Sequence, residues 1–97
     1  MEPWRTLITA IVDKVCAHES IDPMQSKVEL RFLVKNEVRC ALEIAVRGPR
    51  RMRPTALWSW GETKVLYYDS AGKRWAEDLL EGNVVPPPEL LELWGKL

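Results

Sequence analysis

The stretch KVELRFLVKNEVRCALEIAV, residues 27–46, decides the fold. Apolar residues occupy nearly every second position on both sides of residues 35–37, which is the pattern of a β-hairpin with one apolar face and one charged face. Both apolar sets share a face only if Val34 lies near Val38. The pattern therefore predicts a three-residue connection, with Asn36 in the left-handed conformation.

The residues before this hairpin predict a helix. Apolar side chains recur at intervals of three and four residues from Trp4 to Cys16, which is the period of an amphipathic helix over residues 3–18. Pro3 suits the first helical turn, and Asp22-Pro23 ends the run. Because neither element can leave its apolar side in water, we expect the helix to cover the apolar face of the sheet.

A second hairpin is predicted further along, where Leu57–Trp60 and Thr63–Tyr68 flank Gly61-Glu62. This pair fits a two-residue turn with glycine first, in which Trp58 lies opposite Val65. The other side chains of the hairpin then point to the opposite face, and these are Leu57, Ser59, Lys64, Leu66 and Tyr68. Both faces of this hairpin are therefore expected to be substantially apolar.

The remaining segments complete a single domain. Residues 73–81 fit a strand or a short helix, and we favour a brief strand that passes into a helical turn. Pro86–Pro88 form a stiff spacer before a last short helix over Glu89–Leu97. Its apolar residues fall on one side, namely Leu90, Leu93, Trp94 and Leu97. The predicted fold class is α+β: an N-terminal helix packed on an antiparallel sheet of four to five strands (two successive hairpins), with a short C-terminal helix, in one domain over residues 1–97.

Composition points to a soluble domain that folds unaided. Apolar residues make up 46% of the 97 residues and charged residues 29%, which is typical of a globular chain. Fourteen basic residues balance fourteen acidic ones, so no net charge draws the whole molecule to nucleic acid or a membrane.

Cys16 and Cys40 are too few for a disulfide framework, and we expect two reduced, buried thiols. Charges such as Asp13 interrupt the first segment, which excludes a signal peptide or membrane span and predicts a cytoplasmic protein.

No catalytic or metal-binding motif is present in the sequence. The one histidine, His18, lies two residues from Cys16, and at that helical spacing the two side chains diverge. The chain has no Gly-x-Ser-x-Gly motif or glycine-rich phosphate loop, and its three Cys and His residues are too few for a structural zinc site. Glu77 and Asp78 are adjacent and are expected to be solvated charges. The sequence therefore predicts a non-catalytic protein without a cofactor or metal.

The sharpest polar feature is a basic loop between the two hairpins. Arg47, Arg50, Arg51 and Arg53 fall within seven residues that contain no acid. This loop either binds phosphate groups or is a solvated loop. Nearby Trp58 and Trp60 either offer stacking surfaces to single-stranded nucleic acid or belong to the core.

Five tryptophans are many for a chain of this length. A single core under one helix holds two or three of them, so the sequence requires a second apolar surface. Leu57, Leu66 and Tyr68 supply that surface, and the stretch from Val84 to Trp94 is long enough to cover it. Cover from within the chain is the favoured interpretation. If the tail is displaced or crosses to a neighbour, the surface becomes an interface.

The order of helix, strands and helix resembles that of double-stranded-RNA-binding domains, which have a similar length. Those domains share a lysine-rich start to the final helix, whereas residues 88–92 of this chain are Pro-Glu-Leu-Leu-Glu. The resemblance covers element order alone, so it assigns no role to any residue.

These observations predict a small protein-interaction domain, such as an adaptor, an inhibitor or an accessory subunit. Its partner is another protein or a second copy of the chain in a homodimer. Binding of nucleic acid through the basic loop is the alternative. The predicted binding residues are Arg47, Arg50, Arg51, Arg53, Leu57, Trp58, Trp60, Leu66 and Tyr68.

Overall fold

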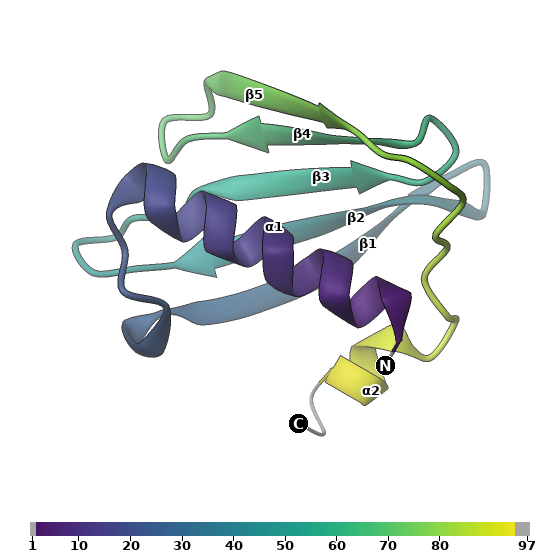
Figure 1. The fold of residues 1–97 in the computed structure, drawn as a ribbon, viewed down its shortest axis with the longest axis horizontal. Coiled ribbons are helices and arrows are strands. Elements are labelled where there is room, and N and C mark those ends of the chain that lie inside the picture. Colours follow the sequence, from purple (N-terminus) through teal and green to yellow (C-terminus); the bar gives the residue numbers. More distant parts are fainter. Residues whose placement is uncertain (1, 95–97) are drawn as a thin grey trace.

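A computed structural model describes residues 2–94 and has the predicted α+β architecture (Figure 1). The strands form one antiparallel sheet in which each strand pairs with the next along the chain. In chain order the elements are α1 (Pro3–Glu19), the 3-10 turn η1 (Pro23–Gln25), β1 (Lys27–Lys35), β2 (Val38–Arg47), β3 (Thr55–Ser59), β4 (Lys64–Tyr68), β5 (Arg74–Leu79) and α2 (Leu90–Trp94). None of the helices within residues 2–94 is long and apolar enough to cross a membrane.

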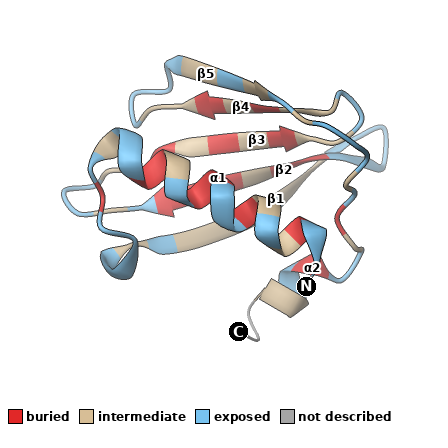
Figure 2. Ribbon diagram, in the orientation of Figure 1, coloured by how far each residue is buried: buried red, intermediate tan, exposed pale blue. Residues whose placement is uncertain are grey.

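Helix α1 lies across one face of the sheet, as its period predicts (Figure 1). Its buried residues face the strands (Figure 2) and include Trp4, Ile8 and Val15. The helix ends at Ser20, whose left-handed φ of 55° lets the N–H of Ile21 donate to the carbonyl of Cys16 at 2.9 Å. This is a Schellman ending, and Ile21 is itself buried in the core.

The face of the sheet that α1 covers carries most of the core. Alternate residues of β2 and of the second hairpin point toward the helix and are buried there. These are Leu42, Ile44, Val46, Ala56, Trp58, Val65 and Tyr67. The register of the second hairpin is as predicted, because Trp58 lies opposite Val65.

The turn of the first hairpin differs from the prediction. Asn36 is left-handed, as expected, but Glu37 is left-handed too, and the two form a two-residue connection between paired Lys35 and Val38. Such mirror-image turns match the twist of the strands. A β-bulge then restores the alternation and leaves Cys40 as an extra, exposed residue. The prediction of a buried thiol is therefore wrong for Cys40, while Cys16 is buried.

Two further local predictions are corrected in the second half of the chain. The left-handed residue of the second turn is Thr63, with φ 50°, and not Gly61. Residues 74–79 form a strand, but no helical turn follows it, because the N–H of Leu80 donates to the carbonyl of Thr63 at 2.8 Å and extends the contact with the second hairpin.

The C-terminal segment covers a different surface from the predicted one. It packs beside the start of α1, where Leu90 is fully buried in the same core. A guanidinium N–H of Arg5 donates to the carbonyl of Leu93 at 3.3 Å, and the Arg5 side chain lies between the rings of Trp4 and Trp94. The predicted position of Leu97 lies outside the described residues. Within residues 2–94, the second face of the sheet is thus left without the cover that the sequence suggested.

Candidate binding surface

The sheet face turned away from α1, here called the open face, carries an apolar strip. In the strand register Leu57 lies opposite Leu66, and Tyr68 lies next to them on the same face. These side chains are half-buried by their neighbours in the sheet, but they do not belong to the core cluster of the described residues. Leu79 at the edge is 78% exposed. Three of the predicted binding residues therefore do lie together on one accessible surface.

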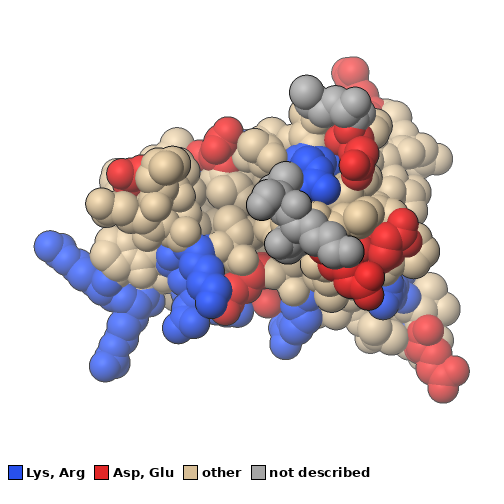
Figure 3. Space-filling model, turned by 90° about the horizontal axis from the view of Figure 1, so that it is seen from below, with Lys and Arg blue, Asp and Glu red and all other residues tan. Residues whose placement is uncertain are grey.

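Basic residues outnumber acidic ones on the open face. The pairing of the strands places Lys27, Arg31, Arg47, Lys64 and Arg74 on it, against Glu29, Glu43 and Glu77, and Lys64 also pairs with Glu62 at 2.9 Å. Lys and Arg side chains accordingly gather along the side of the molecule turned away from α1, at the lower edge of Figure 3. The chain as a whole has no net charge, but the uneven distribution of its charged residues gives the open face a local positive charge.

Two glutamates hold some of these arginines in place. Glu29 lies between Arg47 and Arg53, with N to O distances of 3.6 and 3.7 Å. Glu43 pairs with Arg31 at 3.2 Å and with Arg53 at 3.7 Å. The basic loop predicted from the sequence is therefore only partly free, because two of its four arginines share carboxylates on β1 and β2.

The other two loop arginines, Arg50 and Arg51, are exposed at the tip of the connection between β2 and β3. Within residues 2–94 neither makes an ion pair with a carboxylate. They extend the positive charge of the open face beyond the end of the sheet.

The predicted tryptophans lie on the opposite side of the sheet from the apolar strip. Trp58 is 0% exposed under α1, so the prediction that it contacts a partner is wrong. Trp60 is half-buried and packs edge-on against Phe32 and Trp58, with ring centroids 6.1 and 5.8 Å apart. It lines a groove of about 390 Å³ together with the proline spacer of its own chain. Neither tryptophan stands beside the basic loop as a stacking platform.

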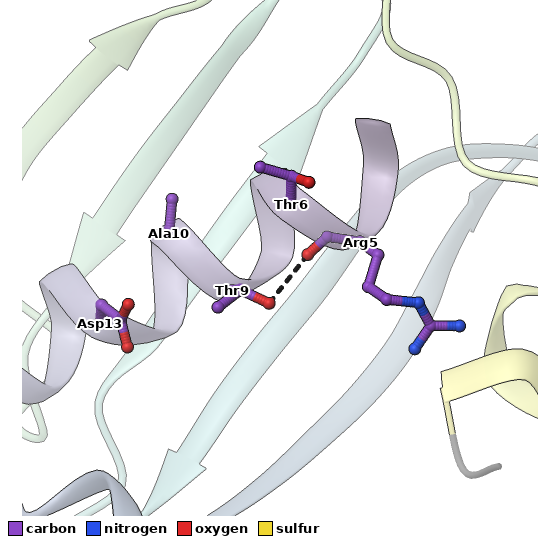
Figure 4. A pocket seen from close by; sticks show the side chains of 5 residues that line it. All are labelled: Arg5, Thr6, Thr9, Ala10 and Asp13. Carbon is purple, nitrogen blue, oxygen red and sulfur yellow. Dashed lines mark hydrogen bonds between the residues drawn. The ribbon is translucent and has the colours of Figure 1, made fainter. Parts of the chain in front are cut away.

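A shallow depression on the outer side of α1 offers little chemistry (Figure 4). It is lined by Arg5, Thr6, Thr9, Ala10 and Asp13. The Thr9 hydroxyl donates to the carbonyl of Arg5 at 2.9 Å, and the Arg5 side chain points away toward α2 (Figure 4). Asp13 is the one carboxylate in this lining, so the depression has no pair of groups for acid–base work.

A polar network between α1 and the last two strands was missed by the sequence analysis. Lys14 donates to one carboxylate oxygen of Asp78 at 2.8 Å, and the hydroxyl of Tyr67 donates to the other at 2.9 Å. Nearby, the ring of His18 stacks on Trp75 with centroids 3.5 Å apart. Asp78 is therefore a paired, half-exposed charge and not a freely solvated one. The sequence contained a sign of this network. A strand through Trp75 that pairs with β4 places Asp78 opposite Val65, on the face of the sheet that α1 covers.

The hydrogen bonds and burial of this network shift the pKa values of its members. The hydrogen bond from Lys14 lowers the pKa of Asp78, and the bond from Tyr67 acts in the same direction. Burial, and then the hydrogen bond to Asp78, raise the pKa of Tyr67. Burial also raises the pKa of the Cys16 thiol, which makes it a poor nucleophile. At neutral pH Asp78 is therefore charged, and Tyr67 and Cys16 are protonated.

Asp78→Asn is expected to lower the free energy of unfolding by about 1 kcal/mol at pH 7, because the half-exposed pair with Lys14 loses its charge. The pKa of Asp78 is lower in the folded protein than its usual 3.8, so the pair stabilises the fold above that pH and stops doing so as the pH falls through the folded value. Urea denaturation from pH 7 to pH 2 measures this. The neighbouring variant Glu77→Gln serves as control, and an equal loss at pH 2 would contradict the role of the charge.

Among residues 2–94, no group of three or more His, Cys, Asp or Glu side chains is placed to hold a metal ion.

No protein-family model matches the chain, and no curated protein or solved structure is significantly similar to it. The open face and its basic loop are therefore assessed on their own geometry and charge.

Proposed function

We propose that this domain is a non-catalytic binding module that holds a partner protein on the open face of its sheet, as an adaptor, an inhibitor or an accessory subunit. The supporting observation is the position of the C-terminal segment. Because the described part of that segment packs beside α1, the partly exposed strip of Leu57, Leu66 and Tyr68 stays outside the core cluster of residues 2–94. Contiguous apolar surface with a polar rim is typical of protein interaction sites.

The charge around the strip indicates the chemistry of the partner. Arg74 lies opposite Tyr68 at the end of the strip nearest the basic loop, while Lys64, at the other end, pairs with Glu62 at 2.9 Å. A partner surface with an apolar centre and acidic side chains around it complements this arrangement. A second copy docked face to face would bring like charges together, which disfavours the homodimer.

Nucleic acid is the less favoured partner. Single-stranded nucleic acid binding combines basic grooves with aromatic platforms, and Trp58 and Trp60 lie on the opposite side of the sheet. Tyr68 is the one aromatic residue that the strand register places on the open face among the described residues.

We also propose that the protein works in the cytoplasm. Cys16 and Cys40 are both free, and Cys40 is exposed. An exposed unpaired thiol suits a reducing compartment. The proposed cytoplasmic location does not depend on which protein the partner is.

The test is capture of a partner by the tagged chain from its native lysate, with matched variants. Leu66→Glu places a negative charge in the middle of the strip and is expected to reduce capture of a specific partner about tenfold or more. Ala10→Glu, on the outer side of α1, introduces the same charge and is expected to leave capture unchanged.

Three results would contradict this function. One is equal capture by Leu66→Glu and the unaltered chain. Another is a stable dimer of the purified protein in analytical ultracentrifugation that Leu66→Glu dissociates. The third is retention by single-stranded DNA that collapses between low and moderate salt, which would favour the nucleic-acid alternative.

A further inference from the structure

A hollow of about 470 Å³ lies in the loop that joins β2 to β3. Three of its five lining residues are arginines, Arg47, Arg51 and Arg53, and the other two are Gly48 and Met52. The remaining loop arginine, Arg50, stands next to it at the tip. Guanidinium groups gathered in one concave loop suit an anionic ligand.

The backbone of this loop is held on both sides. The N–H of Met52 donates to Pro49 at 3.1 Å, and the N–H of Gly48 donates back to Met52 at 3.0 Å. On the outer side, the N–H of Arg53 donates to the hydroxyl oxygen of Ser70 at 3.0 Å. The arginines therefore start from a fixed backbone, which lowers the entropy cost of binding a ligand.

Close packing also fixes the base of the loop. A Cβ atom at Gly48 would lie 2.8 Å from the terminal carbon of Ile21, the residue that ends the Schellman motif of α1. The loop thus packs directly against the core, and the contact with Ile21 fixes its position relative to the end of α1.

The tip of the loop contains two consecutive residues in an unfavourable conformation. Arg50 and Arg51 have φ values of 60° and 63°. Each such residue costs about 1–2 kcal/mol, and glycine or asparagine would adopt this turn more easily. Arginine at both positions is therefore a costly choice for the fold alone, and strain of this kind is often found at functional sites.

The charge of the hollow is not balanced by the described part of the protein. Arg47 and Arg53 pair with Glu29, and Arg53 also pairs with Glu43, whereas Arg50 and Arg51 make no ion pair with a described carboxylate. Positive charge is thus left over at a site lined by planar, forked donors. Guanidinium groups bind tetrahedral oxyanions through paired hydrogen bonds, and a doubly charged phosphate monoester matches the excess better than a single carboxylate does.

We propose that this hollow is a binding site for a phosphoryl group, carried by a phosphorylated side chain of the partner protein. The proposal rests on the proposed function and adds to it: the partner's apolar surface covers the strip on the open face, and its phosphoryl group enters the hollow at the end of the sheet. Recognition of phosphorylated side chains by arginine clusters works in this way.

The experiment titrates the ¹⁵N-labelled full chain with a short phosphoserine peptide and follows the amide resonances. The expected result is saturable shifts centred on Gly48 and Met52, with none from the unphosphorylated peptide. Arg51→Gly keeps the left-handed turn and removes the guanidinium, so it is expected to weaken binding about tenfold. Lys35→Ala, an exposed basic residue at the far end of β1, is the control and is expected to bind as the unaltered chain does.

Equal affinity for the two peptides, or equal affinity of Arg51→Gly and the unaltered chain, would overturn the site. Tighter binding of a ten-nucleotide single strand, with shifts spread over the whole open face, would also overturn it in favour of nucleic acid. The peptide titration needs no partner. If it fails while Leu66→Glu still abolishes partner capture, the phosphoryl site alone is wrong and the binding face stands.

Discussion

Trp58→Ala is expected to lower the free energy of unfolding by about 3–5 kcal/mol. Trp58 is 0% exposed, lies between α1 and the centre of the sheet, and meets Trp60 edge to face. Its ring N–H has no hydrogen-bond partner in the described protein, so alanine removes apolar packing and breaks no hydrogen bond of this side chain. The loss comes from the transfer of the ring to water and from the cavity left behind.

Trp60→Ala is the matched control for this prediction. Trp60 lies two residues further on the same side of the sheet, but its side chain is half-exposed at the rim of the core. Its loss is expected to cost clearly less than that of Trp58. Urea denaturation followed by circular dichroism measures both variants. Equal losses, or a Trp58→Ala variant as stable as the unaltered chain, would contradict the position of Trp58 in the core.

The fold could be predicted because apolar periodicity reports directly on burial. The alternation along residues 27–46 and 57–68 predicted the two hairpins, and the helical period of residues 3–18 predicted the covering helix. What the alternation could not show was the turn at Asn36-Glu37. A two-residue turn with a bulge and a three-residue turn bring the same strands together, and the choice depends on local twist rather than on burial.

The destination of the C-terminal segment was also beyond the sequence. Residues 84–94 are apolar enough to cover either face of the sheet. The outcome depends on where β5 ends and on the space beside the start of α1, where Leu90 is fully buried. Neither the end of β5 nor the size of that space can be predicted from the spacing of apolar residues in the sequence.

The candidate site was predicted in part. The register inferred for the second hairpin already placed Trp58 on the side of Val65 and Leu57 on the other side, so a surface containing both was inconsistent with it. The loop arginines were found from their density, but their ion pairs with Glu29 and Glu43 depend on how the loop folds over β1 and β2. Net charge, which sums over the chain, could not reveal that basic residues gather on one face.

The central claim is that the face opposite α1 is open, and the neighbouring residues Val65 and Leu66 test it. Val65 is fully buried under α1, whereas Leu66 points to the other face and is only partly buried. Glutamine at position 65 buries an amide without a partner and is expected to cost about 3 kcal/mol or more. Glutamine at position 66 remains in water and is expected to cost less than about 1 kcal/mol.

The decisive measurement is the free energy of unfolding of Val65→Gln and Leu66→Gln, determined side by side by urea denaturation at pH 7. The account predicts a large loss for Val65→Gln and a small one for Leu66→Gln. A loss at Leu66 as large as that at Val65 would mean that the chain covers this face itself, and it would contradict both the open face and the binding function built on it.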